Sequence, residues 1–129
     1  MARVFTLEEA RATLPLVKQL MERAQRARRD LIRLRPELWP TLQKAALNGG
    51  SREAGDALLH FQELERGVKG ILALGVIVKD IDMGLVDFLA MRDGHEVYLC
   101  WRHGEEEIRY WHDIYAGLAG RTPLDDLIE

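Results

Sequence analysis

The stretch LVDFLAMRDGHEVYLCWR, residues 85–102, decides the fold of this chain. Apolar and polar residues alternate on both sides of Asp93-Gly94, and this dipeptide is the strongest short-range signal for a β-hairpin. The sequence therefore predicts two antiparallel strands, over 85–92 and 95–102, joined by a two-residue turn.

The tight turn also predicts which side chains share a face, because side chains alternate along a strand. In this register Asp87 lies opposite Cys100. We expect a third strand over 107–112, which returns through a turn at Gly104-Glu105. The face that is predicted to cover the helices then consists of Val86, Phe88, Ala90, Val97, Leu99, Trp101, Ile108 and Tyr110, with His112 at its edge.

The opposite face of the predicted sheet mixes charged with apolar side chains. Leu89, Met91, Tyr98 and Trp111 give it a substantial apolar area among Asp, Glu and Arg residues. A patch of aromatic residues and Met among Arg and Glu is typical of a protein interface. These four residues are therefore interface candidates.

Upstream of the sheet, the period of the apolar residues is that of a helix. Stripes with alternating spacings of three and four predict a short helix at about 7–12 and a long helix at about 14–34, separated at Pro15. A looser helical segment follows over 37–47, and a second long helix over about 52–74. Stripes of this period suit helices that pack lengthwise against each other.

These patterns together predict an α+β fold, with a long antiparallel helical hairpin packed on a small three- to four-stranded antiparallel β-meander. We expect one domain over 1–129, mainly helical over 1–75, with the meander and a C-terminal tail over 76–129. No apolar run is long enough to cross a bilayer, and the N-terminus lacks the apolar core of a signal peptide. We therefore expect a cytoplasmic protein without a membrane partner.

The residues that could carry chemistry are concentrated in the sheet region. The single cysteine excludes an internal disulfide and a multi-thiolate metal site. Histidine and carboxylate side chains together could bind a divalent ion and activate water, although none of the familiar metal-binding spacings is present. No cofactor is predicted, and a divalent metal remains an alternative. The ligand or metal candidates are Asp87, His103, Glu105, His112 and Arg121.

A possible nucleic-acid site rests on the arginine-rich segment 23–35. Arg26, Arg29 and Arg33 form one helical stripe, which could follow a row of phosphates. The formal net charge of −3 argues against nucleic-acid binding as a property of the whole protein. A local explanation also exists, because arginines near the C-terminus of a helix complement its dipole.

Three segments carry a family resemblance: KDIDMGLVDF (79–88), YLCWRHGEEEIRYWHD (98–113) and GLAGRTPL (117–124). Together with VFTLEEARATLPLVKQL (4–20), they resemble a family of small conserved bacterial proteins of unknown function. The resemblance implies no activity. It implies a shared pattern that consists of Asp87, Glu105, Trp111, His112 and Arg121.

The sequence alone does not reveal the function, but it narrows the choice to three hypotheses. The favoured hypothesis is a noncatalytic or regulatory interaction module that self-associates as a homo-oligomer or binds a protein partner. The alternative is a metal- or small-ligand-binding protein, or a hydrolase, with a site at Asp87, Glu105, His112 and Arg121. A second alternative is nucleic-acid binding through 23–35. Whether the protein is an enzyme is left open.

Overall fold

A computed structural model of the chain describes residues 3–48 and 57–129. It combines helices with a mostly antiparallel sheet, so the predicted α+β class is confirmed. Within the described residues, no helix combines the length and the apolar character needed to span a bilayer. The elements are β1 (Val4–Phe5), α1 (Leu7–Leu34), the 3-10 helix η1 (Pro36–Leu38), α2 (Trp39–Asn48), α3 (Leu58–Ala73), β2 (Ile77–Asp80), β3 (Leu85–Arg92), β4 (His95–Arg102), β5 (Tyr110–Asp113), the 3-10 helix η3 (Leu118–Gly120) and β6 (Thr122–Pro123).

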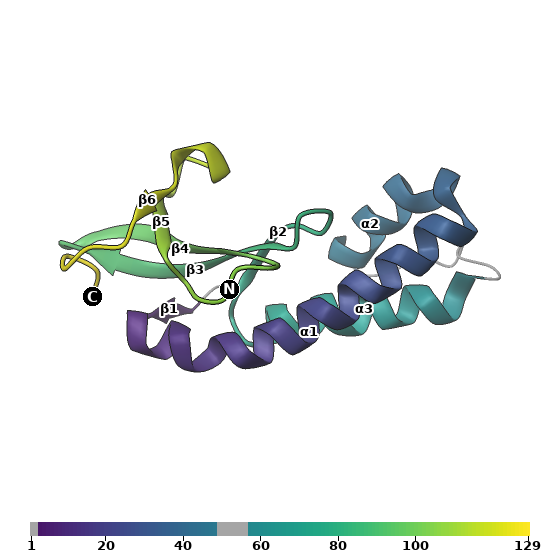
Figure 1. Ribbon diagram of the computed structural model, residues 1–129, viewed down its shortest axis with the longest axis horizontal. Coiled ribbons are helices and arrows are strands. Elements are labelled where there is room, and N and C mark those ends of the chain that lie inside the picture. The colour runs from purple at the N-terminus through teal and green to yellow at the C-terminus, as the bar shows by residue number, and fades with distance from the viewer. Residues whose placement is uncertain (1–2, 49–56) are drawn as a thin grey trace.

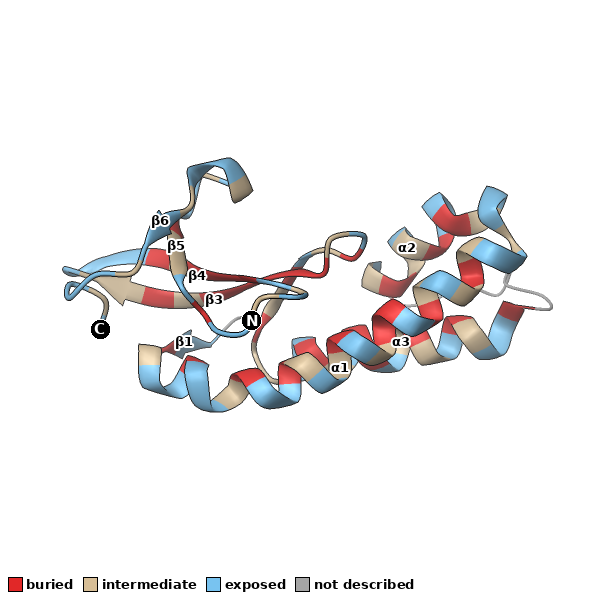
Figure 2. Cartoon of the chain, viewed as in Figure 1, coloured by how far each residue is buried: buried red, intermediate tan, exposed pale blue. Residues whose placement is uncertain are grey.

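The helix α1 runs along the long axis of the molecule. It contacts both the sheet and the other helices. Figure 1 shows the sheet beside the first half of α1, with α2 and α3 grouped around its second half. The buried side chains of the helices and of the sheet form one apolar cluster. Figure 2 shows these buried positions where the layers meet. The sheet therefore shares its apolar core with α1 and α3, and Gln25 of α1 also donates to the carbonyl oxygen of Ile81 after β2.

The predicted interruption of the first helix at Pro15 is wrong, because α1 is continuous through this residue. Proline removes one backbone hydrogen bond from a helix interior. Leu14 and Val17 lie next to it and are buried in the core, so tertiary packing holds the helix through the defect. Thr13 donates its hydroxyl to the carbonyl oxygen of Glu9 at 2.8 Å, as a residue inside a helix does.

The helices α1 and α3 lie side by side and run in opposite directions (Figure 1). Gly67 permits their close approach, because a Cβ atom there would lie 2.7 Å from the carbonyl oxygen of Leu20 and 3.0 Å from Ala24 Cβ. This packing explains a glycine inside a helix, where glycine costs about 1 kcal/mol relative to alanine. The predicted helix over 52–74 corresponds to α3, and its expected first part, 52–56, lies outside the described residues.

The pairing of β3 with β4 follows the register that the Asp93-Gly94 turn predicts. It runs from Arg92 opposite His95 to Leu85 opposite Arg102, without a shift. Asp93 and Gly94 both have positive φ, as a two-residue hairpin turn of this kind requires. The turn dipeptide therefore determines the faces of the two central strands.

The sheet is larger than the expected three- to four-stranded antiparallel meander. It has six strands in the order β1-β3-β4-β5-β6, with β2 also paired to β3. Val4 and Phe5 of β1 pair with Leu89 and Ala90 of β3 in parallel, whereas the other pairs are antiparallel. The sequence pattern does not predict the parallel pair, because a strand of two residues is too short to show an alternation of apolar and polar residues.

The expected register of the third long strand is wrong by one residue. Trp111, and not Tyr110, lies opposite Leu99, and Tyr110 lies opposite Cys100. The cause is the loop 103–109, which is longer than the predicted tight turn. Such a slip moves every side chain of the strand to the other face of the sheet.

This slip exchanges two site candidates between the faces. His112, which was expected at the edge of the helix-facing side, lies opposite Tyr98 and so shares the outer face with Asp87. Trp111, which was expected on the outer face, lies on the helix-facing side and packs against the core. Tyr110, also predicted to face the helices, lies opposite Cys100 on the outer face. Six other side chains of the predicted helix-facing set belong to the apolar core and confirm that part of the prediction: Val86, Phe88, Ala90, Val97, Leu99 and Trp101.

Candidate functional site

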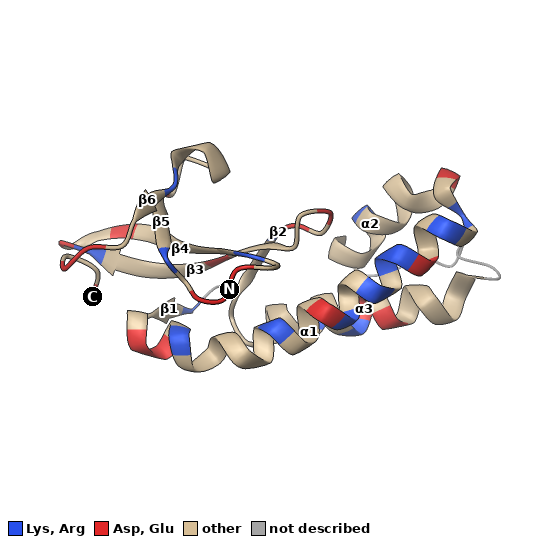
Figure 3. Cartoon of the chain, in the orientation of Figure 1, with Lys and Arg blue, Asp and Glu red and all other residues tan. Residues whose placement is uncertain are grey.

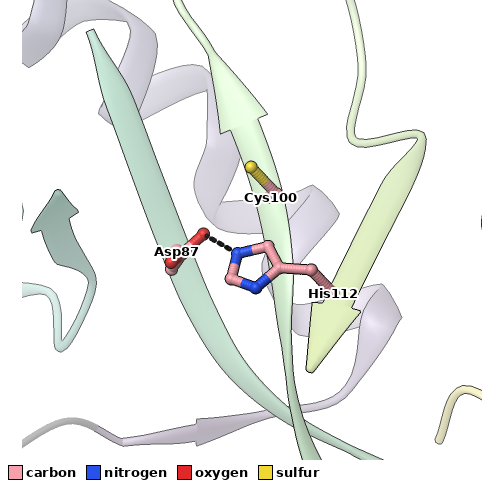
Figure 4. A group of neighbouring side chains, drawn as sticks. All are labelled: Asp87, Cys100 and His112. Atoms are coloured by element: carbon pink, nitrogen blue, oxygen red, sulfur yellow. Dashed lines mark hydrogen bonds and ion pairs between the residues drawn. The ribbon is translucent and has the colours of Figure 1, made fainter. Parts of the chain in front are cut away.

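The outer face of the sheet holds a buried pair of ionisable residues. His112 Nε2 lies 3.0 Å from Asp87 Oδ1, and the two side chains are 3% and 1% exposed. Asp87 projects from β3 and His112 from β5, on either side of β4 (Figure 4). The register of three strands therefore brings together two residues that are 25 positions apart in the chain.

The hydrogen bonds of His112 indicate which atoms of the Asp87–His112 pair carry a proton. Its Nδ1 lies 2.7 Å from the backbone carbonyl oxygen of Asp113, which can only accept, so Nδ1 carries a hydrogen. The contact between Nε2 and Asp87 then needs one further proton, which is held by the imidazole or by the carboxyl group. Burial raises the pKa of Asp87, while the charge of His112 and its hydrogen bond act in the opposite direction.

Cys100 completes a group of three at this position. Its thiol comes from β4, directly opposite Asp87, and is fully buried. Burial, together with the negative charge of Asp87, raises the pKa of the Cys100 thiol to about 12. Cys100 was not among the site candidates, although its predicted pairing with Asp87 was the signal that could have identified it.

A second ion pair lies next to this group. Arg121 donates from Nη2 to Glu105 Oε1 at 2.6 Å and to the backbone carbonyl oxygen of Cys100 at 3.3 Å. Its guanidinium group also stacks on the ring of Tyr110, with 4.2 Å between the guanidinium carbon and the ring centre. Burial acts to lower the pKa of Arg121, but the hydrogen bonds and charges of Glu105 and Cys100 together outweigh this effect and raise it. Both pairs therefore meet at Cys100.

The structure thus brings four of the five ligand candidates to one region and leaves the fifth outside it. His103 lies 2.9 Å from Glu22 of α1, through its Nε2. Its ring stands edge-on to Trp101, with 6.5 Å between the ring centres. This position ties the loop after β4 to α1. His103 is accordingly a helix contact and not part of the group around Cys100.

Three of the four interface candidates occupy the outer face, as expected. Leu89, Met91 and Tyr98 are half-buried there. Trp111 is the exception, because it lies on the other face beneath the guanidinium group of Arg92, with 4.4 Å to the ring centre. The outer face therefore retains a half-buried apolar strip next to the Asp87–His112 pair.

Acidic partners accompany most of the arginines proposed for phosphate binding. Arg29 lies 3.9 Å from Glu22, and Arg33 lies 3.0 Å from Asp30. Figure 3 shows that basic and acidic residues alternate along this part of α1. Arg26 appears in no ion pair within the described residues, but it acts on the charge of Glu22. A stripe with this many local counterions offers little free positive charge to a phosphate backbone.

Comparison with known proteins identifies the family but no function. No curated protein matches the chain. No solved structure matches it either. A family model described as "Uncharacterized conserved protein (DUF2203)" matches residues 3–124, which is nearly the whole chain. The chain therefore belongs to this family of uncharacterised conserved proteins.

Proposed function

We propose that the protein binds a metal ion or another small ligand at a site formed by Asp87, Cys100 and His112, with Arg121 and Glu105 beside it. The observation that supports this proposal most strongly is the buried Asp87–His112 contact at 3.0 Å. Ionisable groups that are buried together and carry perturbed pKa values occur preferentially at functional sites.

The composition of this region favours a binding role over a purely structural one. Burying an ion pair costs desolvation free energy, and well-packed apolar residues of similar volume are often as stabilising. Two ion pairs nevertheless converge on Cys100, one through its side chain and one through its carbonyl oxygen. The helix-facing side of the same strands is apolar, so the sheet itself does not require these charges.

The ligand proposal is tested by analysis of the purified protein and of matched variants. We expect elemental analysis or native mass spectrometry to detect a bound species on the wild-type protein, or a panel of divalent ions, phosphate and small carboxylates to raise its melting temperature. Asp87→Asn and His112→Gln should lose this binding. His103→Gln is the matched control, because His103 pairs with Glu22 outside the site.

Two results would contradict the ligand proposal. One is a folded wild-type protein that carries no bound species and responds to no member of the panel. The other is an equal loss of binding in His103→Gln and His112→Gln, because a response shared by both variants would not report on the group around Cys100.

Self-association is a second candidate function, and a different observation favours it. A hollow of about 710 Å³ on the outer face is lined by the apolar or aromatic side chains of Met91, Ile114 and Tyr115 and by the polar residues His95, Glu96 and Asp113. Tyr115 is 96% exposed, and Ile114 is 38% exposed. Met91 connects this hollow to the outer-face strip of Leu89 and Tyr98, and a surface that mixes apolar and aromatic with charged side chains is typical of contacts between proteins.

The self-association proposal makes a simple prediction for the exposed tyrosine. Sedimentation velocity should show a concentration-dependent dimer for the wild-type protein, and Tyr115→Glu should shift it towards the monomer. Because Tyr115 is almost fully exposed, this change should leave the melting temperature of the monomer unaltered. A wild-type protein that sediments as a monomer at every concentration would rule out this role.

A further inference from the structure

Three different donor atoms gather on the outer face of the sheet, one from each of three adjacent strands. A carboxylate oxygen of Asp87, the sulfur of Cys100 and a ring nitrogen of His112 all lie within 4.8 Å of one another. Figure 4 shows the three side chains grouped together, from β3, β4 and β5. Each of the three residues is at most 2% exposed, so water competes little for these atoms.

We propose that Asp87 Oδ1, Cys100 Sγ and His112 Nε2 bind one divalent transition-metal ion of the zinc class. This inference rests on the proposed ligand-binding function and names the ligand. The donor set supports the choice of ion. Thiolate and imidazole ligands suit zinc and cobalt, whereas magnesium and calcium prefer sites built from oxygen atoms alone.

The orientation of His112 matches that of a metal ligand. A metal-bound histidine almost always donates its other ring N–H to a carboxylate, a backbone carbonyl oxygen or a water. His112 Nδ1 lies 2.7 Å from the carbonyl oxygen of Asp113. This bond turns Nε2 towards Asp87 and Cys100 and fixes the tautomer in which Nε2 can bind an ion.

Two of the three donors already lie close to the spacing of a metal site. Zinc bonds of about 2.0–2.3 Å place neighbouring ligands of a tetrahedral site about 3.3–3.6 Å apart. Asp87 Oδ1 and His112 Nε2 are 3.0 Å apart in the structure. An outward movement of a few tenths of an ångström would set these two donors, and the Cys100 sulfur, which lies within 4.8 Å of both, would have to rotate into the tetrahedral position.

The charges also balance when the ion is bound. One carboxylate, one thiolate and one neutral imidazole carry two negative charges, which a divalent ion cancels. Binding forms three bonds to the ion and releases two protons, one from the thiol and one from the Asp87–His112 contact. Two cationic side chains act on this region, Lys79 on Asp87 and Arg121 on Cys100, and Glu105 pairs with Arg121.

Three protein ligands leave the fourth position of a tetrahedral ion free. Structural zinc sites are usually closed by four protein ligands, whereas sites that bind an exchangeable water or a substrate have three. The described residues supply three donors at this position. The cationic side chains Lys79 and Arg121 nearby favour an anionic fourth ligand, such as hydroxide or a carboxylate.

Cobalt(II) titration of the metal-free chain, residues 1–129, tests the proposal by spectroscopy. We expect one ion per chain, a thiolate-to-cobalt charge-transfer band in the near ultraviolet, and visible bands with the intensity of a four-coordinate ion. Zinc should displace cobalt and abolish these bands. The bands report on the ligand atoms directly, so the test does not depend on knowing an activity.

Matched variants assign the bands to residues. Cys100→Ala should remove the charge-transfer band, and it should remain folded, because it replaces a buried neutral side chain with a smaller one. Asp87→Asn and His112→Gln should weaken cobalt binding by about tenfold or more, since even residues behind the ligands typically contribute this much. Circular dichroism verifies that each variant is folded. His103→Gln should bind cobalt as the wild-type protein does.

The outcomes separate this inference from the function on which it rests. A folded wild-type protein without a charge-transfer band at saturating cobalt, or a band that persists in Cys100→Ala, overturns the metal site. If that protein nevertheless binds phosphate or a carboxylate, and Asp87→Asn abolishes this binding, only the metal inference fails. If nothing binds, both proposals fail.

Discussion

Replacing Gly84 with alanine is expected to reduce the free energy of unfolding by about 2–5 kcal/mol. Two costs combine at this position. Gly84 has a φ of +65°, and a Cβ atom there would overlap His103 Cβ. His103 cannot easily withdraw, because its ring is bonded to Glu22 of α1.

Gly94→Ala is the matched control for this prediction. Gly94 also has a positive φ, at +79°, but apart from its chain neighbours no atom of the described residues lies within 4 Å of the position that a Cβ would take. Alanine there should therefore cost only the backbone strain, about 1–2 kcal/mol. Urea denaturation of both variants measures the difference. Equal losses would show that the contact with His103 contributes nothing to the effect.

The second large effect is expected when Asp87 is replaced by alanine. This change leaves the buried His112 without its partner, and removal of one member of a buried pair typically costs about 3–5 kcal/mol. Asp87→Asn should cost much less, because its amide can donate a hydrogen bond to Nε2 while Nδ1 still donates to Asp113. Equal losses in the two variants, measured in urea at neutral pH, would contradict the inferred hydrogen bonding.

The same pair should produce a pH-dependent difference between wild type and Asp87→Asn. Burial raises the pKa of Asp87 above its usual value of 3.8. The folded state therefore binds a proton more tightly than the unfolded state, and this contribution to stability is complete below pH 3.8 and lost as the pH rises through the raised pKa. The stability of Asp87→Asn relative to wild type should accordingly increase as the pH is raised from about 4 towards about 7, which urea denaturation across this range measures. A difference that does not change with pH would contradict the raised pKa.

Local patterns predict the parts of this fold that local interactions determine. Asp93-Gly94 predicts the register of β3 and β4 because a two-residue turn leaves no freedom in the pairing. The helical periods predict the positions of α1 and α3. Pro15 is misleading because the hydrogen bond that it removes is visible in the local sequence. The burial of Leu14 and Val17 against other elements, which compensates for this loss, is not.

Most residues of the candidate site were predicted, but Cys100 was missed and the arrangement was wrong. Asp87 and His112 were both named, yet the sequence placed them on opposite faces. Their meeting depends on the length of the loop 103–109, which contacts from distant parts of the chain determine. Glu105 is bonded to Arg121, and Lys18 donates to the carbonyl oxygen of Glu106. No local pattern contains these interactions.

The pairing of β1 with β3 has a consequence for the order in which the protein assembles. Val4 and Phe5 emerge from the ribosome early, but their partners on β3 are made only after both long helices. Contacts between segments so far apart in sequence form late. The chain must first lose the conformational entropy of closing a long loop before such contacts can stabilise it. The helical layer should consequently form first during synthesis and serve as the surface on which the sheet, and with it the Asp87–His112 pair, is completed.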